Sequence, residues 1–188
     1  MQESMKKSTK KAVVAAMKGS PTIYVIVHEG QNYIVNGHLL VAGTSEDIES
    51  ILVSMKITPR GEGTYTQGGK GYLHRKERTP SLETIIKKAI NGSYPVEQTP
   101  VLLADEDGFI RVILSNGKSI LINELYYTVL KAIAEDNVGA LVAGTPDDPV
   151  RVTNNGKVLA LAMPIAYLLQ KKLGYFALFA GVAKGFQK

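Results

Sequence analysis

The sequence predicts an α+β protein whose antiparallel sheet is built from two repeated β-α-β modules, with the helices together on one face of the sheet. Asn-Gly pairs at 36–37, 116–117 and 155–156 each separate two short apolar runs, which favours tight β-hairpins. Between the hairpins, apolar residues recur at helical spacing. With 188 residues, 45% hydrophobic and 21% charged, the chain can bury a real core.

The first module is predicted to begin with a basic helix, because closely spaced lysines precede the apolar patch 12–17. A further helix opens near 44–45, where Thr44 and Ser45 can cap it and nearby acidic residues suit its positive end. Its apolar stripe consists of Ile48, Ile51, Leu52 and Met55. The strands expected between these two helices are 23–27, 33–35 and 39–42.

The segment that follows, TPRGEGTYTQGGKGYLHRKERTP, is rich in glycine and charge, and we expect it to be a long exposed connector. A helix is expected after it, with Thr79 as the cap and Pro80 at its first position, ending near Asn91-Gly92. Its inward side would carry Leu82, Ile85, Ile86 and Ala89.

The second module repeats the order of the first more clearly. Asn123 can cap a helix over 124–135, whose buried stripe would be Leu125, Val129, Leu130 and Ile133. The strands expected around this helix are 101–104, 109–114, 119–122, 138–143, 150–153 and 158–163.

The two Asn-Gly segments around 36–37 and 116–117 share one pattern: a strand, a turn, a strand and a capped helix. The two segments share a pattern more than identical residues. Either an internal duplication or chance hairpins could explain this likeness. We expect an N-terminal module over 1–78, with the basic helix and the connector, and a C-terminal module over 79–188, with an extra C-terminal helix.

The stretch DPVRVTNNGKVLALAMPI resembles the final module of the DNA sliding clamps, the ring-shaped processivity factors, whose bacterial members end in a similar Met-Pro strand. The matching positions are Asp148, Pro149, Val150, Met163 and Pro164. The resemblance covers the second half of the chain and reaches the first half only through the repeated pattern. It implies a clamp-like fold, double-stranded DNA and clamp-binding peptides of replication proteins as partners, and a homo-oligomer.

The chain departs from that family in length. Clamp chains carry two or three complete domains and usually end at the Met-Pro strand, whereas this chain has about one domain and continues for 24 residues past Pro164. Two functions therefore stay open. One is a non-enzymatic clamp-like, DNA-associated processivity or recruitment factor, and the other is a phage or mobile-element protein that binds or inhibits another protein without a DNA ring.

DNA binding is expected to be directed at the phosphate backbone, because the chain carries a net charge of +5 and clusters its lysines and arginines. A solvated helix face is the competing interpretation of the N-terminal lysines, and exchanging those four for glutamate would separate the two. The residues expected to contact DNA are Lys6, Lys7, Lys10, Lys11, Lys70, Arg75, Lys76, Arg78, Lys87 and Lys88.

The Met-Pro strand end has two interpretations. Met163 either fills the core while Pro164 ends the strand, or the pair borders a groove for partner peptides, as the resemblance implies. Under the second interpretation the C-terminal tail, with Tyr175, Phe176 and Phe179, lies in or near the groove. Truncation after Ile165 would then increase the affinity for a clamp-binding peptide.

No catalytic residues, metal ligands or cofactors are predicted. The stretch GTYTQGGKGY lacks the spacing of a phosphate-binding loop, and His28, His38 and His74 do not have the spacing of a zinc site. The absence of cysteine excludes disulfides and fits a reducing compartment, so we expect a cytoplasmic protein. The apolar stretch 173–183 is too short to span a bilayer, and no membrane contact is expected.

Overall fold

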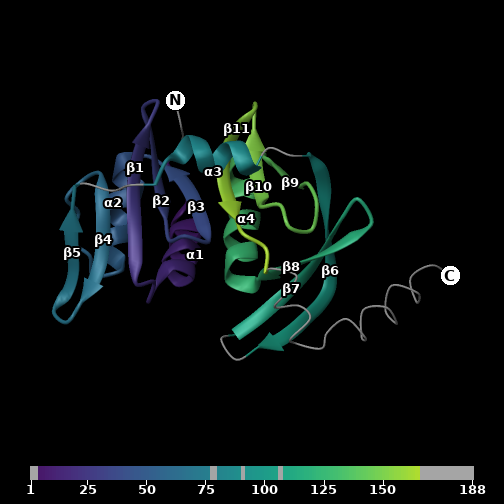
Figure 1. The fold of residues 1–188 in the computed structure, drawn as a ribbon, viewed down its shortest axis with the longest axis horizontal. Helices are drawn as coiled ribbons and strands as arrows, with labels where there is room; N and C mark the ends of the chain where they lie inside the picture. Colours follow the sequence, from purple (N-terminus) through teal and green to yellow (C-terminus); the bar gives the residue numbers. More distant parts are fainter. Residues whose placement is uncertain (1–3, 77–79, 90–91, 106–107, 166–188) are drawn as a thin grey trace.

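The computed structural model describes residues 4–76, 80–89, 92–105 and 108–165, and the side chains of 87–89 fall outside this description. It forms a mixed α/β protein with one large antiparallel sheet and four helices in this part of the chain (Figure 1). The elements are α1 (Lys7–Met17), β1 (Thr22–His28), β2 (Gln31–Val35), β3 (Leu39–Gly43), α2 (Ser45–Ser54), β4 (Gly63–Gly68), β5 (Gly71–Arg75), α3 (Leu82–Ala89), β6 (Tyr94–Asp105), β7 (Gly108–Ser115), β8 (Lys118–Asn123), α4 (Glu124–Asn137), β9 (Ala140–Ala143), β10 (Val150–Asn154) and β11 (Lys157–Ala162).

The strands lie in the order β5-β4-β1-β2-β3-β11-β10-β9-β6-β7-β8. Within this order β4-β1-β2-β3 and β9-β6-β7-β8 have the same arrangement, and each set contains a hairpin followed by a capped helix. The two sets of strands lie in a single sheet, whose two halves are joined by the pairing of β3 with β11.

The second half of the sheet curls back on itself. β6 has an irregular register between Gln98 and Leu102. Its first two residues, Tyr94 and Pro95, pair with β9, and it pairs with β7 from Val96 onward. Beyond β11, the backbone N–H of Ile165 donates to the carbonyl of Leu121 in β8, at 2.8 Å. Because β8 is at the far end of the strand order, this contact brings the two ends of the half-sheet together.

Three helices cover one face of the sheet. α1 and α2 lie over the first half and α4 over the second (Figure 1). They enclose one large apolar core that includes Met17, Ile34, Ile51, Ile113 and Leu130. The predicted stripe of α2 is confirmed, and that of α4 is confirmed except for Leu125, which is 49% exposed. Tyr127, two residues later, is buried where α4 meets the sheet.

The prediction that all helices lie on one face is wrong for α3. Leu82 is buried against Ile26, Tyr33, Val35 and Leu40, which belong to the opposite face from the main core. Figure 1 shows α3 on the other side of the sheet from α1, α2 and α4. The reason is the composition of β3, whose five residues, Leu-Leu-Val-Ala-Gly, are all buried, so that both faces of the strand need a cover. α3 begins at Leu82 rather than at Pro80, and Thr79 lies outside the described residues.

The connector prediction is wrong for 63–75, which form the β4–β5 hairpin at the edge of the sheet. Tyr65 is buried, donates its hydroxyl to the carbonyl of Gly61 at 2.7 Å and accepts from the N–H of Arg60 at 2.9 Å. The Tyr72 hydroxyl donates to the carbonyl of Ser20 at 2.6 Å. Two anchored tyrosines therefore fix the hairpin to the rest of the sheet, while most of its other residues are exposed, as expected for this segment.

Two carboxylates hold the N-terminal segment against the helices. Asp47 of α2 is fully buried, and its carboxylate lies 2.7 Å from the ammonium of Lys10. Asp136 of α4 accepts from the Thr9 hydroxyl at 2.6 Å and lies 2.8 Å from the ammonium of Lys6. These contacts join α1 to α2 and α4 through side chains that are far apart in sequence.

Candidate functional site

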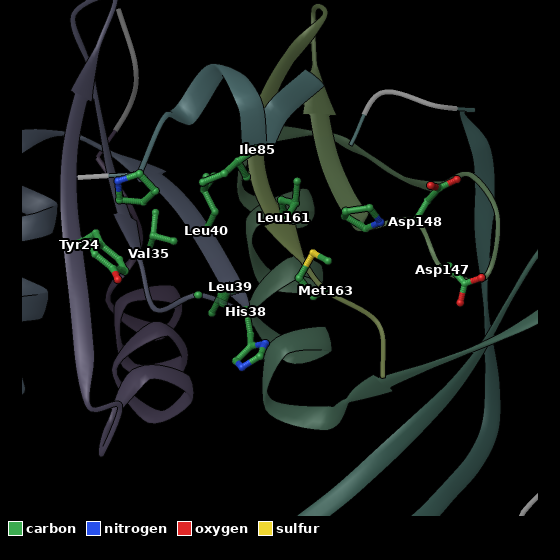
Figure 2. Close-up of a pocket in the computed structure, with 13 residues that line it drawn as sticks. Tyr24, Val35, His38, Leu39, Leu40, Ile85, Asp147, Asp148, Leu161 and Met163 are labelled. Carbon is green, nitrogen blue, oxygen red and sulfur yellow. The ribbon is translucent and has the colours of Figure 1, made fainter. Parts of the chain in front are cut away.

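An apolar pocket lies on the face of the sheet that α3 covers (Figure 2). Its volume is about 550 Å³, which is within the range typical of ligand pockets, about 300–1,000 Å³. Ile85 of α3 forms one wall, and Asp147 and Asp148 from the loop between β9 and β10 form another (Figure 2). Pro149 of the same loop also lines the pocket. The side chain of Met163 lies between Ile85 and the two carboxylates in this view (Figure 2).

The floor of the pocket is a row of residues that face each other across four neighbouring strands. Tyr24 of β1 pairs with Val35 of β2, Val35 pairs with Leu40 of β3, and Leu40 pairs with Leu161 of β11. Directly paired residues project from the same face of a sheet, so the register alone places these four side chains side by side. All four line the pocket.

Met163 follows Leu161 by two residues and therefore projects from the same face. Its N–H donates to the carbonyl of His38 at 2.8 Å, which continues the β3–β11 pairing one residue past the strand. Pro164 has no N–H to donate, so the pairing ends there. Met163 is 40% exposed, so it does not fill the core that the described residues form.

Carboxylates supply the charge at the rim of the pocket. Asp148 is partly buried and accepts from the N–H of Thr145 at 2.6 Å, so it shapes the loop that carries it. Asp147 is exposed. His38 lies at the other end of the pocket, in a turn where the Asn36 side chain accepts from the N–H groups of His38 and Leu39.

The composition of the pocket suits binding better than catalysis. Its floor consists of aliphatic side chains and one tyrosine, and no hydrogen bond joins a nucleophile to a base among its described lining residues. Across the part of the chain that the structure describes, no group of three or more His, Asp or Glu side chains could hold a metal ion.

A larger and more polar hollow, about 940 Å³, lies on the other side of α3. Arg151 lines it but is only 2% exposed, and its guanidinium donates to the carbonyl of Gly92 and to the Ser93 hydroxyl. Burial lowers the pKa of Arg151, although the nearby Asp148 carboxylate opposes this effect. Arg151 therefore holds the segment just before β6 in place. Because this arginine is already engaged, the polar hollow is less well suited to a specific ligand than the apolar pocket.

The residues expected to contact DNA do not form one surface. Lys6 and Lys10 are in ion pairs with Asp136 and Asp47, whereas Lys7 and Lys11 of α1 are exposed. Lys70, Arg75 and Lys76 are exposed on and beside the β4–β5 hairpin. Lys87 and Lys88 belong to α3, on the opposite face from α1, and Arg78 lies outside the described residues.

Of the residues expected to bind a partner, Met163 lines the pocket and Pro164 follows it directly. Tyr175, Phe176 and Phe179 lie outside the described residues. The sequence reasoning missed the floor residues Val35, Leu40 and Leu161, because it assigned them to strands without a register. The Asn-Gly turn at 36–37 was the available signal, since a tight turn there brings β2 and β3 into register.

None of the described helices is long and apolar enough to cross a membrane. Comparisons of this chain with protein-family models, with curated proteins and with solved structures found no match.

Proposed function

We propose that this protein is a non-enzymatic, clamp-like recruitment protein that receives an apolar segment of a partner protein in the pocket beside Met163. The observation that carries the proposal is the exposed Met163 side chain at the rim of an apolar pocket. A methionine side chain is flexible and polarizable, which suits a surface that must fit a partner. Exposed apolar surface within a hollow is typical of interaction sites.

The clamp-like part of the proposal draws support from strand order. The arrangement β4-β1-β2-β3 corresponds to β9-β6-β7-β8, as expected if both halves derive from one duplicated module. In this proposal the chain joins partners to a replication or repair assembly. The alternative, a phage or mobile-element protein that inhibits its partner, would use the same pocket and differ only in the result of binding.

The proposal predicts that Met163→Glu abolishes peptide binding without unfolding the protein. A suitable probe is the neutral peptide Ser-Ser-Leu-Phe-Leu-Gln-Gln-Ser, titrated by calorimetry into every variant and followed by the NMR signal of the Met163 methyl group in the proteins that retain this residue. The substitution places a charge at the apolar rim, so we expect at least a tenfold loss of affinity, roughly the cost of one desolvated polar group. The unfolding midpoint should hardly change, because Met163 is already 40% exposed.

Leu73→Glu is the matched control, because Leu73 is 63% exposed on β5 and lies outside the pocket. This variant should bind the peptide as the wild type does. An unchanged affinity in Met163→Glu, or an equal loss in both variants, would contradict the assignment of the pocket.

Contact with DNA is a second candidate function, supported by the exposed Lys7 and Lys11 on α1. Exchanging all four N-terminal lysines would also break the ion pairs of Lys6 and Lys10, so a double exchange gives the cleaner test. We expect Lys7→Glu with Lys11→Glu to weaken duplex DNA binding by about tenfold at low salt. The slope of log affinity against log salt should become shallower by about 2, since two phosphate contacts are lost.

Lys118→Glu with Lys157→Glu makes the same charge change at two exposed hairpin positions and serves as the control. Filter-binding or fluorescence anisotropy at several salt concentrations measures both pairs. If the control pair weakens binding equally, the effect reports net charge and α1 has no specific role.

A further inference from the structure

The described residues at the rim of the pocket carry negative charge. Asp147 and Asp148 both line the pocket, and none of its described lining residues is a lysine or an arginine. This distribution contrasts with the net charge of +5 for the whole chain. A ligand that fills the pocket therefore meets a local field of the opposite sign from the one the protein presents overall.

The two carboxylates are used differently. Asp148 accepts from the N–H of Thr145, and its charge acts on the guanidinium of Arg151. Asp147 is exposed, and no hydrogen bond or ion pair joins its carboxylate to another residue in the described part of the chain. Asp147 is therefore the carboxylate available to a ligand.

We infer, on the basis of the proposed function, that the pocket selects a partner segment in which an apolar anchor is accompanied by lysine or arginine. The apolar anchor packs on Leu40 and Leu161, and the cation pairs with Asp147 at the rim. The partner is a separate protein that presents this segment. Complementary charges at the rim of an apolar site add specificity and speed association more than they add affinity.

The expected size of the preference for a basic segment follows from the exposure of Asp147. An ion pair at an exposed carboxylate is partly screened by water, so we expect a two- to fivefold preference for the basic segment. The preference should disappear at high salt, because exposed charges are screened over a few ångströms at about 1 M. The contribution of the apolar anchor should stay or increase under the same conditions.

A charge-swap experiment on the full-length chain tests the inference. The probes are the peptide Ser-Ser-Leu-Phe-Leu-Lys-Lys-Ser, its twin with Glu-Glu in place of Lys-Lys, and the neutral peptide. The wild type should prefer the lysine peptide, Asp147→Asn should bind the twins equally, and Asp147→Lys should prefer the glutamate peptide. Glu97→Lys, an equal charge change at an exposed position of β6 outside the pocket, should keep the wild-type preference.

Three other results would contradict, in turn, the role of Asp147, the proposed function and the assignment of the ligand to a separate protein. If the wild type binds both charged twins equally, or if Glu97→Lys reverses the preference as Asp147→Lys does, the role of Asp147 is wrong and the pocket proposal stands. If none of the three peptides moves the Met163 methyl signal, the proposed function itself fails. If Lys171→Glu with Lys172→Glu moves that signal without any peptide, the pocket belongs to this chain's own C-terminal segment and not to a separate partner.

Discussion

Replacing Asp47 with alanine is expected to lower the free energy of unfolding by about 3 kcal/mol, the low end of the cost of breaking a buried ion pair. The fully buried Asp47 carboxylate accepts from the Ser4 hydroxyl at 2.7 Å, from the Met5 N–H at 3.1 Å and from the Thr44 N–H at 3.1 Å. It also lies 2.7 Å from the ammonium of Lys10. Alanine removes all four interactions together, and the apolar core is left to hold α1 against α2 without this polar link.

In the wild type, lowering the pH should remove much of the same free energy of unfolding. Burial on its own would raise the pKa of Asp47, but hydrogen bonds from Lys10, Ser4 and the backbone of Met5 and Thr44 lower it from the ordinary 3.8 to about 2. A carboxyl group with a lowered pKa stabilises the fold above its ordinary pKa, and this stabilisation is lost as the pH falls through the folded value. We expect about 2 kcal/mol to be lost in this way below about pH 4.

Urea unfolding of the wild type, Asp47→Ala and Glu46→Ala, at neutral pH and near pH 2, measures both effects. Glu46 is the matched control, because it is an exposed acidic residue in the first turn of the same helix. Its loss should cost no more than about 0.5 kcal/mol. Equal costs for the two alanines would show that Asp47 acts only through the helix dipole, whereas a gap that does not narrow in acid would show that the stabilisation does not come from its ionised carboxylate.

Local signals in the sequence predicted most of the secondary structure. Thr44 and Asn123 were recognised as caps, and their side chains accept from the N–H groups of Asp47 at 3.2 Å and Leu125 at 2.9 Å. Cap and hairpin signals involve residues within four positions of each other, so they can be read from one sequence. The antiparallel sheet followed from the same hairpins.

The contacts that sequence reasoning missed join distant segments. Asp47 is one of the acidic residues that suit the positive end of the helix near 44–45, and nothing near it in sequence points to Ser4 or Lys10, which are about 40 positions away. The pocket required the register of four strands, of which β11 is far from the other three in sequence. Met163-Pro164 was identified as a candidate site, but the floor beneath it depended on that register.

The face on which α3 lies was also beyond local reasoning. Leu82, Ile85 and Ile86 predict an amphipathic helix, but such a stripe does not indicate which side of a sheet it will cover. The continuous apolar run of β3 was the available signal, since a strand that is buried on both faces needs a layer on each side.

Of the walls of the pocket, α3 depends most on its docking against the sheet. Leu82→Ala is therefore expected to release α3 from the sheet. Leu82 is 3% exposed and packs into the sheet beside Ile85 and Ile86. Removing its side chain should weaken the docking of α3 by about 2 kcal/mol. An eight-residue helix has little stability of its own, so it should open locally while the rest of the fold persists.

Hydrogen exchange followed by mass spectrometry measures this opening. Amides of α3 should exchange about 30-fold faster, the factor that corresponds to about 2 kcal/mol, while those of β3 and β11 keep their protection. Peptide binding should weaken as well, because Ile85 forms a wall of the pocket. Val53→Ala, a similar truncation at an exposed position of α2, should change neither measurement. Unchanged exchange in α3 after Leu82→Ala would mean that the helix is held by contacts other than this anchor, whereas loss of protection throughout the sheet would mean that α3 unfolds only together with the whole protein.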